Sequence, residues 1–192
     1  MDVVIGRLRS ELQRLGVSEN TVVIFMSDNG MFFGERGLSD CWLLYEDSLR
    51  VPMIISDPRQ SDKRHGITAN QIVLNIDISP TILDLAGLDA LPMIQGRSLI
   101  PLMEGKSPVW RTDFFCEHLF THAKIPKSEG VRTERWKYIR YFEQQPVYEE
   151  LFDLASVPQE THNLAGDPQH ADQLELLRQR CDELLAEARG GL

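Results

Sequence analysis

Apolar residues in the first part of the chain form two kinds of pattern. Residues 1–15 space them three or four positions apart and stop at Gly16, which predicts an amphipathic helix. Residues 21–26 (TVVIFM) and 50–55 (RVPMII) instead contain continuous apolar and β-branched runs, typical of strands covered on both faces. A helix followed by such strands predicts a mostly parallel sheet flanked by helices.

A second helix is expected over residues 78–86, where apolar residues share one face and Gly87 follows. Asp77 or Ser79 can cap its first turn, and Pro80 suits that turn. The pattern changes near residue 111. From there the chain reads as short strands separated by turns, at residues 112–117, 129–134, 136–142 and 150–153.

The last segment places its apolar residues along one helical stripe, at Leu174, Leu177, Cys181, Leu184 and Ala188. We therefore predict a small antiparallel sheet covered by a closing amphipathic helix. The fold class is α/β, with residues 1–110 forming part of a larger sheet domain and residues 111–192 a small α+β subdomain.

Composition narrows the function. Among 192 residues, 29 are acidic and 20 are Lys or Arg, giving a net charge of −9. This acidity argues against nucleic-acid binding, which needs a basic face. No apolar run approaches the roughly 18 residues of a membrane span, and no secretory signal is evident, so we expect no membrane contact from this chain. Three scattered cysteines, Cys41, Cys116 and Cys181, argue against a disulfide framework.

The sharpest chemical feature is Asp28-Asn29, directly after the first apolar run. Strand ends are where α/β folds place their chemistry. A carboxylate and an amide oxygen there can both ligate a hard cation such as Ca2+, although two ligands are too few for a complete site. The alternative is a simple turn, because Asp and Asn-Gly are turn formers.

Several spaced motifs together resemble the sulfatase family, whose members are formylglycine-dependent and belong to the alkaline-phosphatase-like superfamily. The residues that carry the resemblance cover nearly the whole chain: Ser27-Asp28-Asn29-Gly30, the Gly-Glu-Arg-Gly loop at 34–37, YEDSLRVP at 45–52, Gln95-Gly96-Arg97-Ser98-Leu99, and VRTERWKY at 131–138. The resemblance implies the C-terminal part of an alkaline-phosphatase-like α/β fold and a sulfuric-ester hydrolase parent.

The resemblance assigns Asp28 and Asn29 as two ligands of a Ca2+ ion that holds the sulfate. Arg36 would grip an anionic substrate group, with a solvated loop arginine as the alternative. The family's sulfate-binding lysine position is occupied here by Cys41. A neutral thiol does not replace a fixed positive charge, so activity is in doubt.

Two further substrate contacts are implied in the second half. His118 lies where the family brings a strand end towards the substrate, and its alternative is a hydrogen-bonded, partly buried histidine. Arg132 would meet a sugar or a second sulfate, or else pair with Glu134 across the sheet.

None of the three cysteines lies in the family's nucleophile motif, Cys/Ser-x-Pro/Ala-x-Arg. The resemblance puts the formylglycine and the remaining calcium ligands in an N-terminal half, and it favours a sulfated carbohydrate or a related sulfate ester as substrate. Whether this chain is itself an enzyme stays open, and alone we expect it to be inactive. The alternatives are a degenerate binding or structural module and a phosphodiesterase or phosphonate-ester hydrolase of the same superfamily. Such sulfatases often act outside the cytoplasm.

Overall fold

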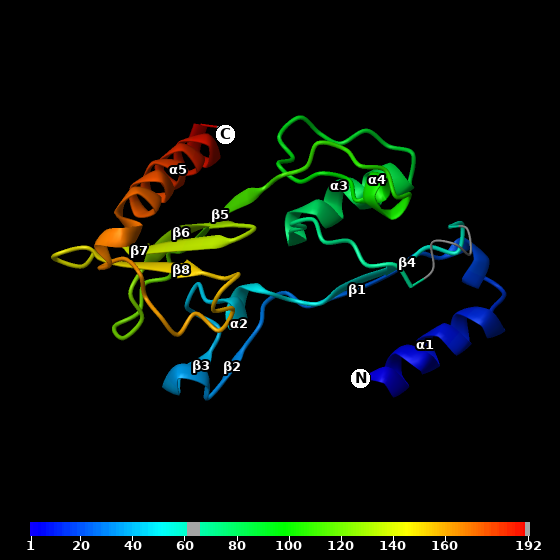
Figure 1. Ribbon diagram of the computed structural model, residues 1–192. Coiled ribbons are helices and arrows are strands. Elements are labelled where there is room, and N and C mark those ends of the chain that lie inside the picture. The colour runs from blue at the N-terminus through cyan, green and yellow to red at the C-terminus, as the bar shows by residue number, and fades with distance from the viewer. Residues whose placement is uncertain (61–65, 191–192) are drawn as a thin grey trace.

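The computed structural model describes residues 1–60 and 66–190 (Figure 1). Its α-helices are α1 (Asp2–Arg14), α2 (Glu46–Leu49), α3 (Ile78–Leu85), α4 (Ile100–Met103) and α5 (Ala171–Gly190). Its strands are β1 (Val23–Met26), β2 (Phe32–Phe33), β3 (Ser39–Asp40), β4 (Met53–Ser56), β5 (Asp113–His118), β6 (Ser128–Thr133), β7 (Trp136–Tyr141) and β8 (Tyr148–Asp153). The α/β class is confirmed, and no helix among the described residues is long and apolar enough to cross a membrane.

The first predicted helix and the two apolar strands are present, but the direction of strand pairing differs from the expectation. β1 and β4 pair antiparallel, with Val23 opposite Ser56 and Met26 opposite Met53. The expectation of a parallel arrangement was wrong for this pair because a continuous apolar run indicates burial, not direction. The pair is also less covered than its sequence suggests, since Ile54 is 62% exposed.

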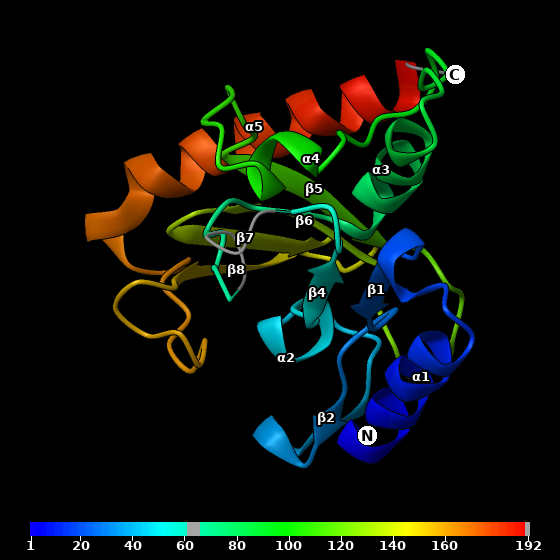
Figure 2. The ribbon, with the colours of Figure 1, turned by 90° about the vertical axis from the view of Figure 1, so that its right-hand side faces the viewer.

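The antiparallel sheet predicted for the second half is confirmed. Its strands run in the order β5-β6-β7-β8, and each adjacent pair is antiparallel. α5 lies along one face of this sheet, while α2 and β2 lie towards the other face (Figures 1 and 2). The sheet is therefore the middle layer of the C-terminal part.

Each face of the sheet has its own apolar core, because successive side chains along a strand point to opposite faces. Tyr138 joins the core under α5, whereas Ile139 and Tyr141 join the core shared with β2 and the segment before α2. Lys137 lies on the same face as Ile139 by this alternation, and its residue is 0% exposed. A lysine therefore occupies a core position of the central strand β7.

The turn before α3 differs from the prediction. Asp77 is fully buried, but its carboxylate does not cap α3. It accepts hydrogen bonds from the backbone N–H groups of Leu74 and Arg97 and pairs with both terminal nitrogens of Arg111, at 2.5 and 2.7 Å. The expectation that Asp77 caps α3 was wrong, because its carboxylate instead binds the backbone of Leu74 just before it and two more distant segments, at Arg97 and Arg111. Asp77 thus joins the first part of the chain to the segment that enters β5.

Candidate functional site

The Asp28-Asn29 turn follows β1 and is organised by its own side chains. The Ser27 hydroxyl donates to the carbonyl of Asn29 at 2.9 Å, and the Asn29 N–H donates to Asp28 Oδ1 at 2.9 Å. Asn29 Nδ2 donates to the carbonyl of Gly30. Within the described part of the chain, these bonds leave Asp28 Oδ2 and Asn29 Oδ1 without a donor. Two oxygens at a half-exposed strand end fit a hard cation as part of its ligand set.

Gly30 brings this turn against α2. Its N–H donates to the carbonyl of Ser48 at 2.8 Å, and a side chain at Gly30 would collide with the carbonyl of Asp47. Only glycine permits so close an approach of two backbones. The glycine of the Ser-Asp-Asn-Gly motif therefore fixes the distance between the turn and α2.

Cys41 follows β3 directly and also contacts α2. The Ser48 hydroxyl donates to the Cys41 carbonyl at 2.5 Å, and Asp40 Oδ1 accepts from the Cys41 N–H at 3.0 Å. Burial raises the pKa of the Cys41 thiol, and the hydrogen bond to Asp40 and the charges of Asp40 and Asp28 raise it further. The same two carboxylates would stabilise an ammonium group at this position. The surroundings of Cys41 thus favour a cation over a thiolate.

His118 ends β5 and lies beside Trp42, with ring centroids 5.7 Å apart. Phe120 stacks on Trp42 at 5.4 Å and is 55% exposed. Burial lowers the pKa of His118, and its buried Nε2 has no hydrogen-bond partner among the described residues. The alternative expectation was a partly buried, hydrogen-bonded histidine. His118 is partly buried, but its Nε2 forms no hydrogen bond with the described residues. His118, Trp42 and Phe120 form a ring-lined surface next to Cys41, hereafter the aromatic surface.

Arg36 points into the protein, and the expectation of a solvated loop arginine was wrong. Its guanidinium is 4.4 Å from the ring centroid of Tyr45 and donates to the carbonyls of Gln159 and Glu160. Only 18% of its side chain is exposed. The role of Arg36 as a substrate ligand stays a prediction, and its donors are already engaged by the protein.

Arg132 is also engaged, and the alternative partner Glu134 was wrong. Its guanidinium lies 3.3 Å from a Glu46 carboxylate oxygen and donates to the Thr133 carbonyl at 2.9 Å. The sequence around Arg132 did not reveal Glu46 as its partner, because Glu46 lies on α2, 86 positions away in the chain. A substrate contact by Arg132 remains a prediction.

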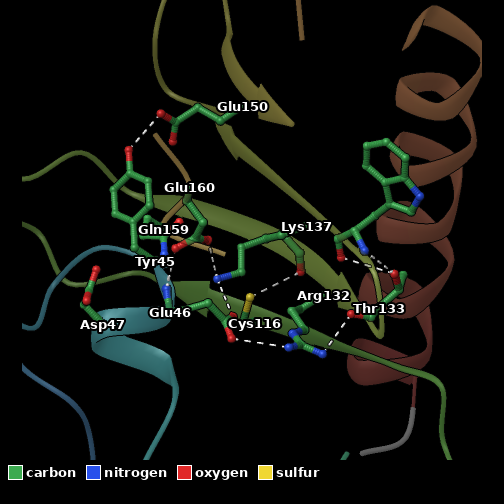
Figure 3. A network of polar contacts seen from close by, with 12 residues as sticks. Tyr45, Glu46, Asp47, Cys116, Arg132, Thr133, Lys137, Glu150, Gln159 and Glu160 are labelled. Atoms are coloured by element: carbon green, nitrogen blue, oxygen red, sulfur yellow. Dashed lines mark hydrogen bonds and ion pairs between the residues drawn. The ribbon is translucent and has the colours of Figure 1, made fainter. Parts of the chain in front are cut away.

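The structure adds residues that the sequence reading missed. Lys137 Nζ lies 2.6 Å from Glu46 Oε1 and 2.7 Å from Glu160 Oε1, and the side chains of Lys137 and Glu160 are 0% exposed (Figure 3). We call Lys137, Glu46, Glu160, Arg36 and Arg132 the buried charge cluster. The sequence offered one signal for this cluster: Lys137 shares a strand face with the apolar residues Ile139 and Tyr141. A lysine on an apolar face is expected to be paired, because lysine is rarely buried otherwise.

The cluster is electrostatically coupled. Burial alone would raise the pKa of Glu46, but Lys137 and Arg132 outweigh it and hold that pKa below its ordinary value. Glu46 is therefore ionised at neutral pH, where it lies between Lys137 and Arg132.

No group of three or more acidic, histidine or cysteine side chains within residues 1–60 and 66–190 is arranged to hold a metal ion. Asp28 and Asn29 fit two positions in the coordination shell of Ca2+, which takes 6–8 oxygens. The remaining ligands have to come from other residues or from substrate and water.

Comparison with known proteins gives consistent matches. The family model described as N-sulphoglucosamine sulphohydrolase, C-terminal, matches residues 34–187. An N-acetylglucosamine-6-O-sulfatase of Bacteroides thetaiotaomicron is 34% identical over 188 residues, which is 95% of this chain and 33% of that protein. The chain thus spans about a third of the length of this curated relative.

Two solved structures are similar in fold. One is a protein in complex with its substrate D-glucosamine-2-N,6-O-disulfate, with a TM-score of 0.85 and 33% identity, covering 93% of this chain and 37% of that one. The other is the phosphonate monoester hydrolase of Agrobacterium radiobacter, with a TM-score of 0.83 and 28% identity, covering 100% of this chain and 39% of that one.

Proposed function

This chain belongs to the sulfatase family represented by the C-terminal domain of N-sulphoglucosamine sulphohydrolase, and we propose that it supplies two calcium ligands and a substrate-facing surface to a sulfuric-ester hydrolase. The observation that carries the proposal is the Asp28-Asn29 turn at the end of β1. Its Asp28 Oδ2 and Asn29 Oδ1 accept no hydrogen bond from the described residues, while Gly30 holds the turn against α2. The chain corresponds to the C-terminal part of the larger sulfatases that it matches.

The remaining part of the site belongs, in this proposal, to an N-terminal region that carries the formylglycine and the other Ca2+ ligands. The bound ion would neutralise charge on the sulfate oxygens during S–O cleavage. Asp28 and Asn29 would orient that ion. Residues 1–110 would complete the catalytic α/β domain with this region, and residues 111–192 would form the small C-terminal subdomain.

Exposed apolar side chains support such an N-terminal partner region. Apolar side chains are exposed on α1 at Val3, Val4 and Leu8, just after α1 at Leu15, and on β4 at Ile54. Apolar surface on this scale is typical of a face that packs against more protein.

A sulfated sugar is the proposed substrate class. A relative that covers 95% of this chain is named N-acetylglucosamine-6-O-sulfatase, and one of the similar solved structures is in complex with its substrate D-glucosamine-2-N,6-O-disulfate. The aromatic surface supports this assignment, because the exposed ring of Phe120 and the ring of Trp42 can stack on the apolar face of a sugar ring.

Cys41 favours the alternative of a non-catalytic family member. Removing one preorganised donor from an oxyanion site typically costs 10²–10³-fold in kcat, and a neutral thiol in place of an ammonium is a comparable loss. Similarity to a phosphonate monoester hydrolase favours the other alternative, a phosphonate-ester or phosphodiester hydrolase. The nucleophile region, for which this chain contains no matching cysteine motif, discriminates between these chemistries.

A chimaera tests the proposal. The C-terminal third of the Bacteroides thetaiotaomicron sulfatase is replaced by this chain, and hydrolysis of a 6-O-sulfated N-acetylglucosamine is measured with and without Ca2+. We expect weak Ca2+-dependent turnover that Asp28→Ala abolishes. Cys41→Lys should raise kcat/KM by on the order of 10²-fold, whereas Cys41→Met, of similar length but neutral, should not.

Turnover that is indifferent to Asp28→Ala would refute the assignment of the metal ligands. A folded chimaera that stays inactive after Cys41→Lys would support the non-catalytic alternative. The isolated chain should hydrolyse no aryl sulfate with Ca2+ present, and turnover abolished by Asp28→Ala would overturn that expectation.

A further inference from the structure

The buried charge cluster lies between the C-terminal sheet and α2, and it makes the first turn of α2 depend on residues 86 to 114 positions away in the chain. α2 has only four residues and no side-chain cap of its own. So short a helix does not persist without tertiary support. Glu160, in the loop after β8, supplies the missing cap, because its Oε2 accepts the Glu46 N–H at 2.8 Å.

Glu160 is itself held firmly. Lys137 lies 2.7 Å from its Oε1, and Arg36 donates to its carbonyl oxygen. Its backbone has a φ of 52°, a left-handed conformation that a non-glycine residue keeps only when its surroundings enforce it. Figure 3 shows Lys137 reaching from β7 towards both Glu160 and Glu46. The carboxylate of Glu160 is thus placed for the cap by the central strand of the sheet.

α2 in turn contacts two segments of the candidate site, the Asp28-Asn29 turn and the segment at Cys41. The Ser48 carbonyl accepts the Gly30 N–H beside Asp28 and Asn29, and the Ser48 hydroxyl donates to the carbonyl of Cys41. The contacts form one chain from β7 through Glu160 and α2 to the turn after β1.

We infer that Lys137 and Glu160 are positioning residues, which set the place of the Asp28-Asn29 turn and of Cys41 by capping and anchoring α2. Neither touches the turn directly. Their relevance to metal binding rests on the proposed function, whereas their control of the turn does not. The C-terminal subdomain would then be part of the apparatus that orients the metal ligands, in addition to contacting substrate.

Residue-resolved amide exchange on this 192-residue chain tests the inference. Glu160→Ala removes the cap and the ion pairs, and the Gly30 amide should exchange about tenfold faster relative to the protected amides of β6, β7 and β8. Glu160→Gln keeps a side-chain oxygen for the Glu46 N–H and should restore much of the protection. Glu160→Gln can still be compared with the unmodified chain if Glu160→Ala does not fold.

Glu149→Gln is the matched control. Glu149 is ion-paired with Arg178 on the α5 side of the same sheet, and it accepts from the Tyr138 hydroxyl. Its replacement should leave the protection of Gly30 unchanged relative to the sheet amides. An equal loss of protection at Gly30 and across the sheet in Glu160→Ala, or no loss at Gly30, would overturn the inference.

Cys41 provides a second readout without any added probe site. Burial raises the pKa of the other two thiols, Cys116 and Cys181, to about 12, so alkylation of the folded chain reports on Cys41. The Cys41 rate should rise severalfold in Glu160→Ala and return towards the unmodified rate in Glu160→Gln. Because neither readout needs metal or substrate, a failure of the proposed function leaves both outcomes interpretable.

Discussion

Replacing Lys137 by methionine is the most direct test of what the buried charge cluster contributes to stability. Methionine keeps the length and the apolar stem of the side chain but removes the ammonium group. Glu46 and Glu160, at 2.6 and 2.7 Å from that group, then lose a common partner in the protein interior. Removing one partner of a buried ion pair typically costs 3–5 kcal/mol, because the other charge stays buried and unpaired.

Two arginines limit the loss in Lys137→Met. Arg132 still lies 3.3 Å from Glu46, and Arg36 lies 3.6 Å from Glu160. We therefore expect destabilisation of about 3 kcal/mol at pH 7, the lower end of the range. With a urea m-value of about 2 kcal/mol/M, the unfolding midpoint should fall by roughly 1.5 M.

The penalty should depend on pH through Glu46. In the unmodified chain its pKa is lowered in the folded state, so its ionised form stabilises the fold above its ordinary value of 4.5. That contribution is lost as the pH falls through the lowered pKa. Without Lys137, the effect of burial prevails and the pKa of Glu46 moves upward. In the variant, Glu46 therefore becomes protonated at a higher pH than in the unmodified chain, and its protonation removes the cost of the buried charge. The difference in unfolding free energy should be larger at pH 7 than near pH 4.5.

Urea unfolding followed by circular dichroism at the two pH values measures both effects. Lys127→Met is the control, since Lys127 pairs with Glu143 near the surface of the same sheet, where such a pair contributes at most about 1 kcal/mol. A penalty for Lys137→Met no larger than that of the control, or one unchanged between the two pH values, would refute the reasoning.

Two other substitutions probe the contacts around α2. Gly30→Ala places a methyl group against the Asp47 carbonyl and should lower the free energy of unfolding by about 1–3 kcal/mol, measured by thermal unfolding. Gly6→Ala, in open space on α1, should be neutral or stabilising. Equal effects of the two substitutions would contradict the close approach at Gly30. Tyr141→Phe removes a hydrogen bond to the buried Glu150 carboxylate, whose pKa burial already raises, and should cost about 2 kcal/mol at pH 7. Because the pKa of Glu150 rises further in that variant, the cost should shrink as the pH falls towards 5, and a larger cost at pH 5 than at pH 7 would contradict this assignment.

Much of the local structure follows from the sequence for simple physical reasons. The four strands of the second half were predicted close to their observed bounds because turns separate short strand-like segments there, and the closing helix was predicted because its apolar residues recur at helical spacing. The Asp28-Asn29 turn was predicted as a candidate site from the types of its side chains and its place after an apolar run. The pairing direction of β1 and β4 was not predictable in this way, and these two strands proved antiparallel.

The sequence by itself determined which segments form helices and strands, which family the chain resembles, and which residues are candidates for ligand chemistry. The tertiary structure alone decided the partners of the buried charges. Arg36, Arg132 and Lys137 each meet a carboxylate far away in the chain, and no local pattern encodes such a pairing. The reason is physical: a buried charge is tolerated only where the fold brings an opposite charge within a few ångströms, and that proximity is a property of the packed chain, not of its order.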